Sequence, residues 1–194
     1  LPNAEKHSAG EANCLQLRGE YLYVAEGSNG TRIYDVASIA NKGFSQKIIT
    51  APFSPLGQDT NIQSKNATCI ALSTTQPIAP ERNTGELMRE KNMEQPMHPV
   101  YKYAYITDSF EGLIATDIGT LADGEARNNH VERAMTWNEN GILNGARHIA
   151  TAGTIFYIVA DAGVVILDLD DPLLPRVIKT IPIADARASQ HRIG

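Results

Sequence analysis

The chain contains three imperfect copies of one segment, and this internal repeat constrains the fold more than any other feature. In each copy an apolar run is followed by a carboxylate, a Gly-containing turn and a second apolar run, and an Asp follows the Gly by five residues. The copies occupy residues 23–35, 105–117 and 157–169. Such self-similarity is typical of architectures in which one small unit is stacked several times. It predicts how the chain is built and says little about its chemistry.

Each copy, taken with its flanking residues, contains four short runs rich in β-branched side chains and bounded by Gly, Pro or Asp. This pattern is typical of antiparallel strands joined by turns. The expected strands are 13–18, 21–25, 31–36 and 45–50 in the first unit, 67–73, 103–107, 113–118 and 131–136 in the second, and 147–151, 155–160, 164–169 and 176–181 in the third. We therefore expect an all-β fold.

Four consecutive strands followed by a passage to the next unit fit the four-stranded antiparallel blades of a β-propeller. The blades are expected at about 11–53, 64–140 and 144–183, and residues 185–191, which parallel 144–149, begin a fourth blade. Propellers have roughly four to eight blades, so three blades leave the ring incomplete. We expect residues 1–194 to form one partial propeller domain. Either the natural polypeptide continues past Gly194 with a further strand, or another chain completes the ring.

The second unit carries a large insertion at about 75–99. Four prolines, at 77, 80, 96 and 99, exclude a regular strand or helix throughout it. A shorter excursion at 52–58 separates the first two units. Long loops in compact domains are often functional, so the insertion could contact a partner; the alternative is that both segments only pack over the edge of a blade.

Composition excludes several classes of partner. The formal charge is −5 and the pI is near 5.5, whereas nucleic-acid and anionic-membrane binding normally require clustered Lys and Arg. No apolar run approaches the roughly 18 residues that a membrane-spanning helix needs. We expect neither a nucleic-acid partner nor a membrane span.

The two cysteines, Cys14 and Cys69, lie in apolar strand-like runs. Buried cysteines usually behave as small hydrophobic residues, so we expect free thiols, with a disulfide as the alternative. The chain has no CxxC pair and no CxxCH haem-attachment motif, which excludes covalently attached haem.

The third-strand runs 164–168, 113–117 and 31–35 resemble the LVIVD repeat of bacterial β-propeller proteins. The turn at 170–177, in which a polar residue and a Pro lead into the outer strand, is similar to that family's turn. The resemblance covers about 11–193 apart from the insertion. It implies a secreted or cell-surface bacterial propeller, usually without an assigned activity. Some members belong to large proteins associated with multihaem cytochromes, so the resemblance also implies an extracytoplasmic location in the periplasm or at the cell surface.

The repeated acids are the first candidates for chemistry. Asp35, Asp117 and Asp168 end third strands, and Glu26, Asp108 and Asp161 end second strands. We interpret them as structural turn caps, because a role in every blade needs one copy per blade, whereas a catalytic group is needed once. Asp168, Asp170 and Asp171 could offer oxygens to Ca²⁺, but they lack the Gly and the distal Glu of an EF-hand loop.

The histidines are His7, His98, His130, His148 and His191. We interpret them as satisfied or solvated, because no HxH or HExxH spacing is present. His148 and His191 are expected at equivalent first-strand positions near the propeller axis, where metal or haem-iron ligation is the alternative. His98, on the insertion, would be the best placed to contact a partner. We expect the single tryptophan, Trp137, to pack at a blade edge.

No GxSxG, P-loop or dinucleotide-binding motif is present, and a fold alone licenses no activity. We assign no catalytic, cofactor-binding or metal-binding residue. The sequence favours a non-catalytic scaffold or protein-interaction module within a larger bacterial assembly, with a protein partner or further blades completing the propeller. The alternative is a subunit of an extracytoplasmic electron-transfer complex that docks beside multihaem cytochromes. An enzyme that uses the central channel is the third possibility.

Overall fold

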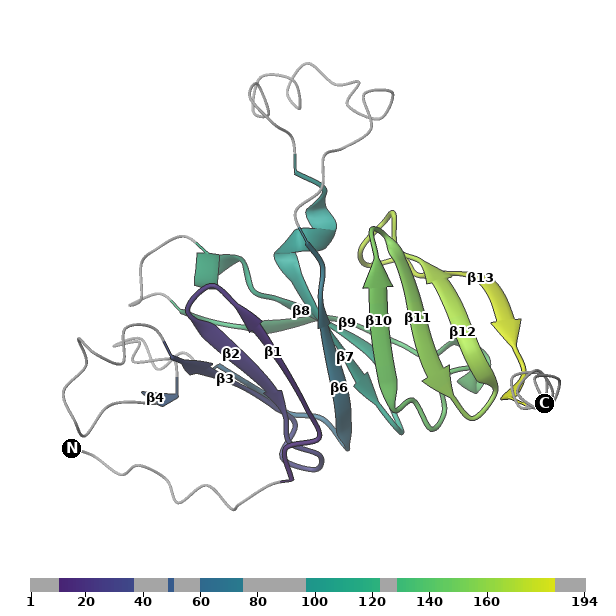
Figure 1. The fold of residues 1–194 in the computed structure, drawn as a ribbon, viewed down its shortest axis with the longest axis horizontal. Helices are drawn as coiled ribbons and strands as arrows, with labels where there is room; N and C mark the ends of the chain where they lie inside the picture. Colours follow the sequence, from purple (N-terminus) through teal and green to yellow (C-terminus); the bar gives the residue numbers. More distant parts are fainter. Residues whose placement is uncertain (1–10, 37–48, 51–59, 75–96, 123–128, 184–194) are drawn as a thin grey trace, which may run out of the picture.

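The structure, a computed structural model, consists of three antiparallel β-sheets that follow one another along the chain (Figure 1). It describes residues 11–36, 49–50, 60–74, 97–122 and 129–183. In every sheet the first four strands pair in sequence order, each with the next, and the first sheet has a fifth strand that also pairs with its third. The predicted all-β fold, built from four-stranded antiparallel units like those of a propeller, is confirmed.

We call the three sheets blades 1, 2 and 3. Blade 1 contains β1 (Cys14–Arg18), β2 (Tyr21–Ala25), β3 (Thr31–Asp35) and β4 (Ile49–Thr50), with β5 (Asn61–Ile62) as a second partner of β3. Blade 2 contains β6 (Ala67–Leu72), β7 (Tyr103–Asp108), β8 (Gly112–Asp117) and β9 (Glu132–Trp137). Blade 3 contains β10 (His148–Ala152), β11 (Ile155–Ala160), β12 (Gly163–Asp168) and β13 (Arg176–Ile181). Short 3-10 helices, η3 (Pro99–Lys102), η4 (Gly119–Ala122) and η5 (Glu139–Gly141), lie in the connections.

The repeated glycine has a physical reason. Gly30, Gly112 and Gly163, which precede the repeated Asp by five residues, have φ values of 77°, 86° and 121°. A Cβ on Gly30 would lie 2.0 Å from the carbonyl oxygen of Ile62, and a Cβ on Gly163 would lie 2.0 Å from that of Ile181. Glycine is the one residue that adopts such a backbone at little cost and also leaves room for a backbone this close.

The strand registers make residues of the three blades equivalent. On the third strands, the repeated Asp residues pair with the first residues of the second strands, which are Tyr21, Tyr103 and Ile155. Two residues further along the second strands lie Tyr23, Tyr105 and Tyr157. Each blade therefore carries a tyrosine at the same position of its second strand.

The same equivalence extends to the innermost strands. The residues opposite Ala25, Thr107 and Val159 are Cys14, Cys69 and His148. These three side chains therefore share one position on β1, β6 and β10. Because β6 contacts both β1 and β10, the three positions are neighbours in space.

The core lies between the blades. One buried cluster joins blade 1 to blade 2 and includes Tyr23, Ile33, Ile70 and Ile106. A second joins blade 2 to blade 3 and includes Tyr105, Leu113, Ile149, Phe156 and Ile158. In the second cluster the rings of Tyr105 and Phe156 meet edge to face, with centroids 4.6 Å apart. Each blade buries one face against its neighbour, as propeller blades do.

The predicted strands differ from the observed ones mainly at their ends. The short strand β5 was not predicted, because two residues between turns carry no periodic signal. Most of the insertion, and residues 185–191 of the expected fourth blade, lie outside the described residues, while Pro99 begins η3. The division into blades at 11–53, 64–140 and 144–183 stays a prediction. In the described part of the chain no helix is long and apolar enough to span a membrane.

Candidate functional site

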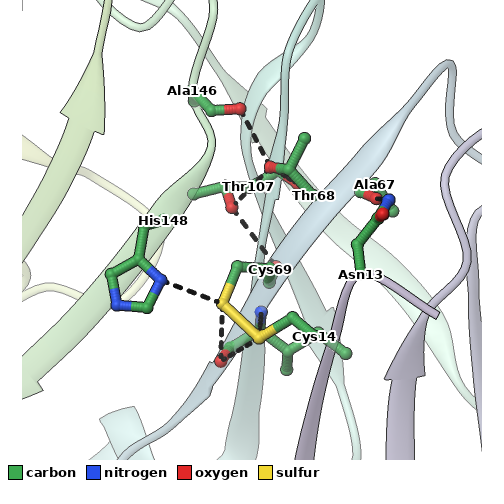
Figure 2. Close-up of a disulfide and its surroundings, with 9 residues drawn as sticks. Asn13, Cys14, Ala67, Thr68, Cys69, Thr107, Ala146 and His148 are labelled. Carbon is green, nitrogen blue, oxygen red and sulfur yellow. Dashed lines mark hydrogen bonds between the residues drawn. A yellow bond between two sulfur atoms is a disulfide. The ribbon is translucent and has the colours of Figure 1, made fainter.

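The innermost strands β1, β6 and β10 lie next to one another and form a junction (Figure 1), whose side chains are drawn in Figure 2. Asn13 donates from Nδ2 to the carbonyl oxygen of Ala67 at 3.0 Å. Thr68 Oγ1 donates to the carbonyl oxygen of Ala146 at 2.9 Å. In both cases the donor is the residue immediately before the equivalent inner-strand position (Cys14 or Cys69), and the acceptor belongs to the next blade. The same kind of inter-blade hydrogen bond therefore occurs twice at this junction, once between blades 1 and 2 and once between blades 2 and 3.

Cys14 and Cys69 form a disulfide across this junction, so the expectation of free thiols is wrong. Their Cα atoms lie 4.8 Å apart, although 55 residues separate them in the sequence. This separation is within the range that a disulfide requires. The pairing arises because neighbouring blades place equivalent residues side by side. Aligning the first strands of the first two units would have revealed it.

His148 occupies the third of these inner positions and is exposed. Its Nδ1 lies 3.7 Å from Cys69 Sγ, and the backbone N–H of Ile70 donates to Cys14 Sγ at 3.4 Å. Each sulfur thus has a nitrogen beside it. Within the described residues no group of three or more His, Cys, Asp or Glu side chains is arranged to hold a metal ion. His191, the expected partner position of His148, lies outside them.

The two outermost blade faces are apolar and partly exposed. The trailing face, on blade 3, carries Tyr157, Val159, Val164 and Ile166. Of the three equivalent tyrosines, Tyr23 is 1% exposed and Tyr105 is 0% exposed, whereas Tyr157 is 40% exposed. Burial under the next blade accounts for the difference, because Tyr23 and Tyr105 both belong to the inter-blade clusters.

The leading face, on blade 1, carries Leu15, Leu17 and Leu22, together with Val24, which is buried. Leu15 is 61% exposed, whereas its equivalents, Ile70 and Ile149, are 0% and 4% exposed. Leu17 is also exposed. The leading and trailing faces therefore present to solvent the two kinds of side chain that the internal interfaces bury.

A cleft of about 640 Å³ lies between blade 1 and the η3 and η4 segments of blade 2. Its cationic groups already have partners. Arg18 donates to the carbonyl oxygens of Tyr101, at 2.8 Å, and Ser73, at 2.5 Å, and its guanidinium lies 4.3 Å from the centroid of the Tyr101 ring. Burial lowers the pKa of Arg18. Lys102 pairs with Asp117 at 2.7 Å. Both cations are therefore engaged in contacts within the fold.

Comparison with known families decides the kind of repeat. Residues 9–45 match the LVIVD repeat family. The chain carries an LVIVD repeat. The matched segment contains β1, β2 and β3 of blade 1, including Cys14 and the leading face. No curated protein matches the chain, and no solved structure matches it.

Asp108, at the end of the second strand of blade 2, is a fully buried cap. Its carboxylate accepts backbone N–H groups from Asn66 at 2.5 Å, Phe110 at 2.8 Å and Glu111 at 2.9 Å. Burial alone would raise the pKa of this carboxyl, but the backbone donors outweigh it and hold the pKa below its usual value. The geometry is that of the expected turn cap.

The carboxylates that end the third strands also cap turns where they are described. Asp117 Oδ1 accepts the N–H of Gly119 at 2.9 Å, and Asp168 Oδ1 accepts that of Asp170 at 3.0 Å. Asp168 also pairs with Arg176 at 2.5 Å. With one oxygen used by a turn and the other by a cation, Asp168 is engaged as a structural group. The side chain of Asp35 lies outside the described residues.

Two of the repeated acids do something else. Glu26 accepts a hydrogen bond from the hydroxyl of Tyr34 at 2.6 Å. Burial, together with this bond, raises the pKa of Tyr34. Asp161 is exposed and pairs with Arg147 at 3.2 Å. The prediction that all three second-strand acids cap turns is therefore wrong for Glu26 and Asp161. The blade 1 hairpin has the same length as that of blade 2, and Glu26 differs because its carboxylate reaches Tyr34, whereas the blade 3 hairpin is one residue shorter.

His98 is buried, so the structure gives no support to the alternative that it contacts a partner. Its Nδ1 accepts the N–H of Val100 at 3.2 Å and begins η3, and its Nε2 lies 3.4 Å from Asp170 of blade 3. His98 thus connects the end of the insertion to the neighbouring blade. Trp137, the last residue of β9, packs against the second core cluster, as predicted. His7 lies outside the described residues.

Proposed function

We propose that this chain is a non-catalytic scaffold, or interaction module, whose leading and trailing faces each receive a further blade of the LVIVD type. The observation that carries the proposal is the tyrosine position, which is fully buried in blades 1 and 2 and 40% exposed in blade 3. Partly exposed apolar side chains that cluster on one face mark interfaces in water-soluble proteins.

A blade is the occupant that fits because the chain already contains this interface twice. In both copies a tyrosine-bearing trailing face packs on a face of the leading type, which offers Ile70 to Tyr23 and Ile149 to Tyr105. The unpartnered faces are the missing halves of the same contact, since Tyr157 has no following blade and Leu15 no preceding one among the described residues. Burying a large apolar side chain contributes about 1.5–3 kcal/mol, so two such anchors favour closure of the interface.

Self-association of the chain tests this proposal. Because the two faces are complementary, one copy presents its trailing face to the leading face of the next, which is a head-to-tail contact. We expect concentration-dependent association of the wild-type chain in sedimentation-velocity experiments. Tyr157→Glu should abolish it, and Leu15→Glu should abolish it independently, because each places a charge in an apolar interface.

The matched control is Leu174→Glu. Leu174 is 71% exposed but lies in the turn after β12, outside both faces. This variant should associate as the wild type does. A wild-type chain that stays monomeric at every accessible concentration, while cooperatively folded, would overturn the proposal; so would association that survives both face variants.

The proposal also includes an extracytoplasmic location and, as the second candidate function, docking beside an electron-transfer protein. A disulfide is typical of proteins in oxidising compartments, which supports an extracytoplasmic location. Docking beside a multihaem cytochrome rests on the family resemblance alone and stays a prediction. A Soret band that co-purifies with the native assembly would support it, and a colourless native assembly would count against it.

A further inference from the structure

We propose that the Cys14–Cys69 disulfide at the inner-strand junction is a thiol–disulfide exchange site whose substrate is a thiol, either of low molecular weight or on a partner protein. His148 would be the positioning residue of this site. The proposal rests on contacts within the junction and not on blade docking, although His148 shares the trailing face with its cross-strand partner Val159.

The two sulfurs differ in accessibility, and this difference assigns their roles. Cys69 is 3% exposed, whereas Cys14 is partly exposed. An incoming thiolate therefore reaches Cys14 Sγ first. Access selects which sulfur of a disulfide is attacked. Cys69 is then the leaving group.

The leaving sulfur lies next to a group that can stabilise it. His148 Nδ1 lies 3.7 Å from Cys69 Sγ. Once the thiolate forms, an N–H at this atom can donate a hydrogen bond to it, and the imidazolium form of the ring can also transfer its proton. A neighbouring histidine favours the thiolate form of cysteine. The N–H of Ile70, which donates to Cys14 Sγ, serves the other sulfur in the same way when that sulfur leaves in turn.

A thiolate attacks Cys14 Sγ and forms a mixed disulfide, while the Cys14–Cys69 bond breaks and its electron pair stays on Cys69 Sγ. A second thiolate attacks the mixed disulfide and releases Cys14 as a thiolate. Two thiols are thereby oxidised to one disulfide, and Cys14 and Cys69 are reduced.

The fold can survive this reduction. The cluster that joins blades 1 and 2 holds the two blades together independently of the sulfurs, with Tyr23, Ile33 and Ile70 buried. Asn13 adds its hydrogen bond to Ala67 across the same junction. Opening the disulfide therefore removes one link of several between the blades.

Reaction of the oxidised chain with reduced glutathione tests the assignment. We expect cleavage that is first order in glutathione, little changed by 1 M urea, and a mixed disulfide on Cys14 with an alkylatable thiol on Cys69, as identified by mass spectrometry. His148→Gln and His148→Phe should each slow cleavage about tenfold, which is the order expected for losing a hydrogen bond to a partly developed charge. His130→Gln, a histidine outside the junction, should leave the rate unchanged.

The unfolding midpoint of each oxidised variant, measured in parallel, separates this effect from loss of structure. A disulfide with a purely structural role would open only through unfolding. In that case cleavage would accelerate steeply with urea and become independent of glutathione concentration. Such kinetics, a mixed disulfide on Cys69, or rates that both His148 variants leave unchanged would each overturn the proposal.

Discussion

Replacing Asp108 by Asn should destabilise the chain far more than replacing any other described carboxylate of the repeat. Asp108 is fully buried and accepts three backbone N–H groups, two at Oδ1 and one at Oδ2. An amide oxygen can retain the bonds from Phe110 and Glu111. The amide NH₂ would then face the N–H of Asn66, donor against donor.

The magnitude follows from these three bonds. A hydrogen bond to a charged group contributes about 1.5–3 kcal/mol, whereas one between neutral groups contributes about 0.5–1.5 kcal/mol. Losing one charged bond and weakening two gives about 4–5 kcal/mol at the middle of these ranges, measured as the loss of unfolding free energy in urea. Asp161→Asn is the matched control. Asp161 is exposed in a surface ion pair, so its loss should cost under about 1 kcal/mol.

The lowered pKa of Asp108 also makes the stability of the folded chain depend on pH. Because the pKa of Asp108 is lowered in the folded chain, its stabilisation is present above the unfolded pKa of about 3.9 and is lost as the pH falls through the folded pKa. Wild-type stability should therefore fall more steeply below about pH 4 than that of Asp108→Asn. A cost under about 1 kcal/mol, or equal acid slopes for the two proteins, would refute the reasoning.

Three further predictions concern packing, the repeated glycine and the disulfide. Tyr105→Ala should lower the free energy of unfolding in urea by about 3–5 kcal/mol, because its ring is fully buried between blades. Tyr157→Ala, made in the monomeric Leu15→Glu background, should lower it by under about 2 kcal/mol. Equal losses would contradict the burial argument. Gly163→Ala should lower the thermal midpoint markedly, since its Cβ would lie 2.0 Å from Ile181 O, and an unchanged midpoint would show that β13 can shift freely. Reduction of the Cys14–Cys69 bond should cost about 4 kcal/mol in the chain-entropy estimate for a loop of this length, and the double variant Cys14→Ser/Cys69→Ser should show the same loss without reductant.

The strands were predictable because their signal is local. Runs such as Val164 to Leu167, bounded by Gly163 and Asp168, combine β-branched side chains with turn residues, and β11 and β13 begin and end where the sequence predicts. The repeat also predicted that His148 would approach the centre. Local patterns carry this information because each blade is a single run of hairpins.

The candidate site was less predictable because it depends on contacts between blades. In the sequence, Cys14 and Cys69 lie in two separate apolar runs. They are neighbours in the structure because they occupy equivalent positions on the first strands of adjacent blades. His98 follows a proline-rich segment that suggests an exposed loop, yet it is buried through its contacts with Val100 and Asp170. Exposure of Tyr157 is likewise a property of the last described blade and not of its sequence.

Mixing two face variants tests the central claim most directly, namely that the leading and trailing faces are halves of one interface. Tyr157→Glu keeps an intact leading face, and Leu15→Glu keeps an intact trailing face. Each variant alone should sediment as a monomer of 21.1 kDa. An equimolar mixture should form a one-to-one complex of twice that mass. A mixture that remains monomeric, although wild type associates, would contradict the account.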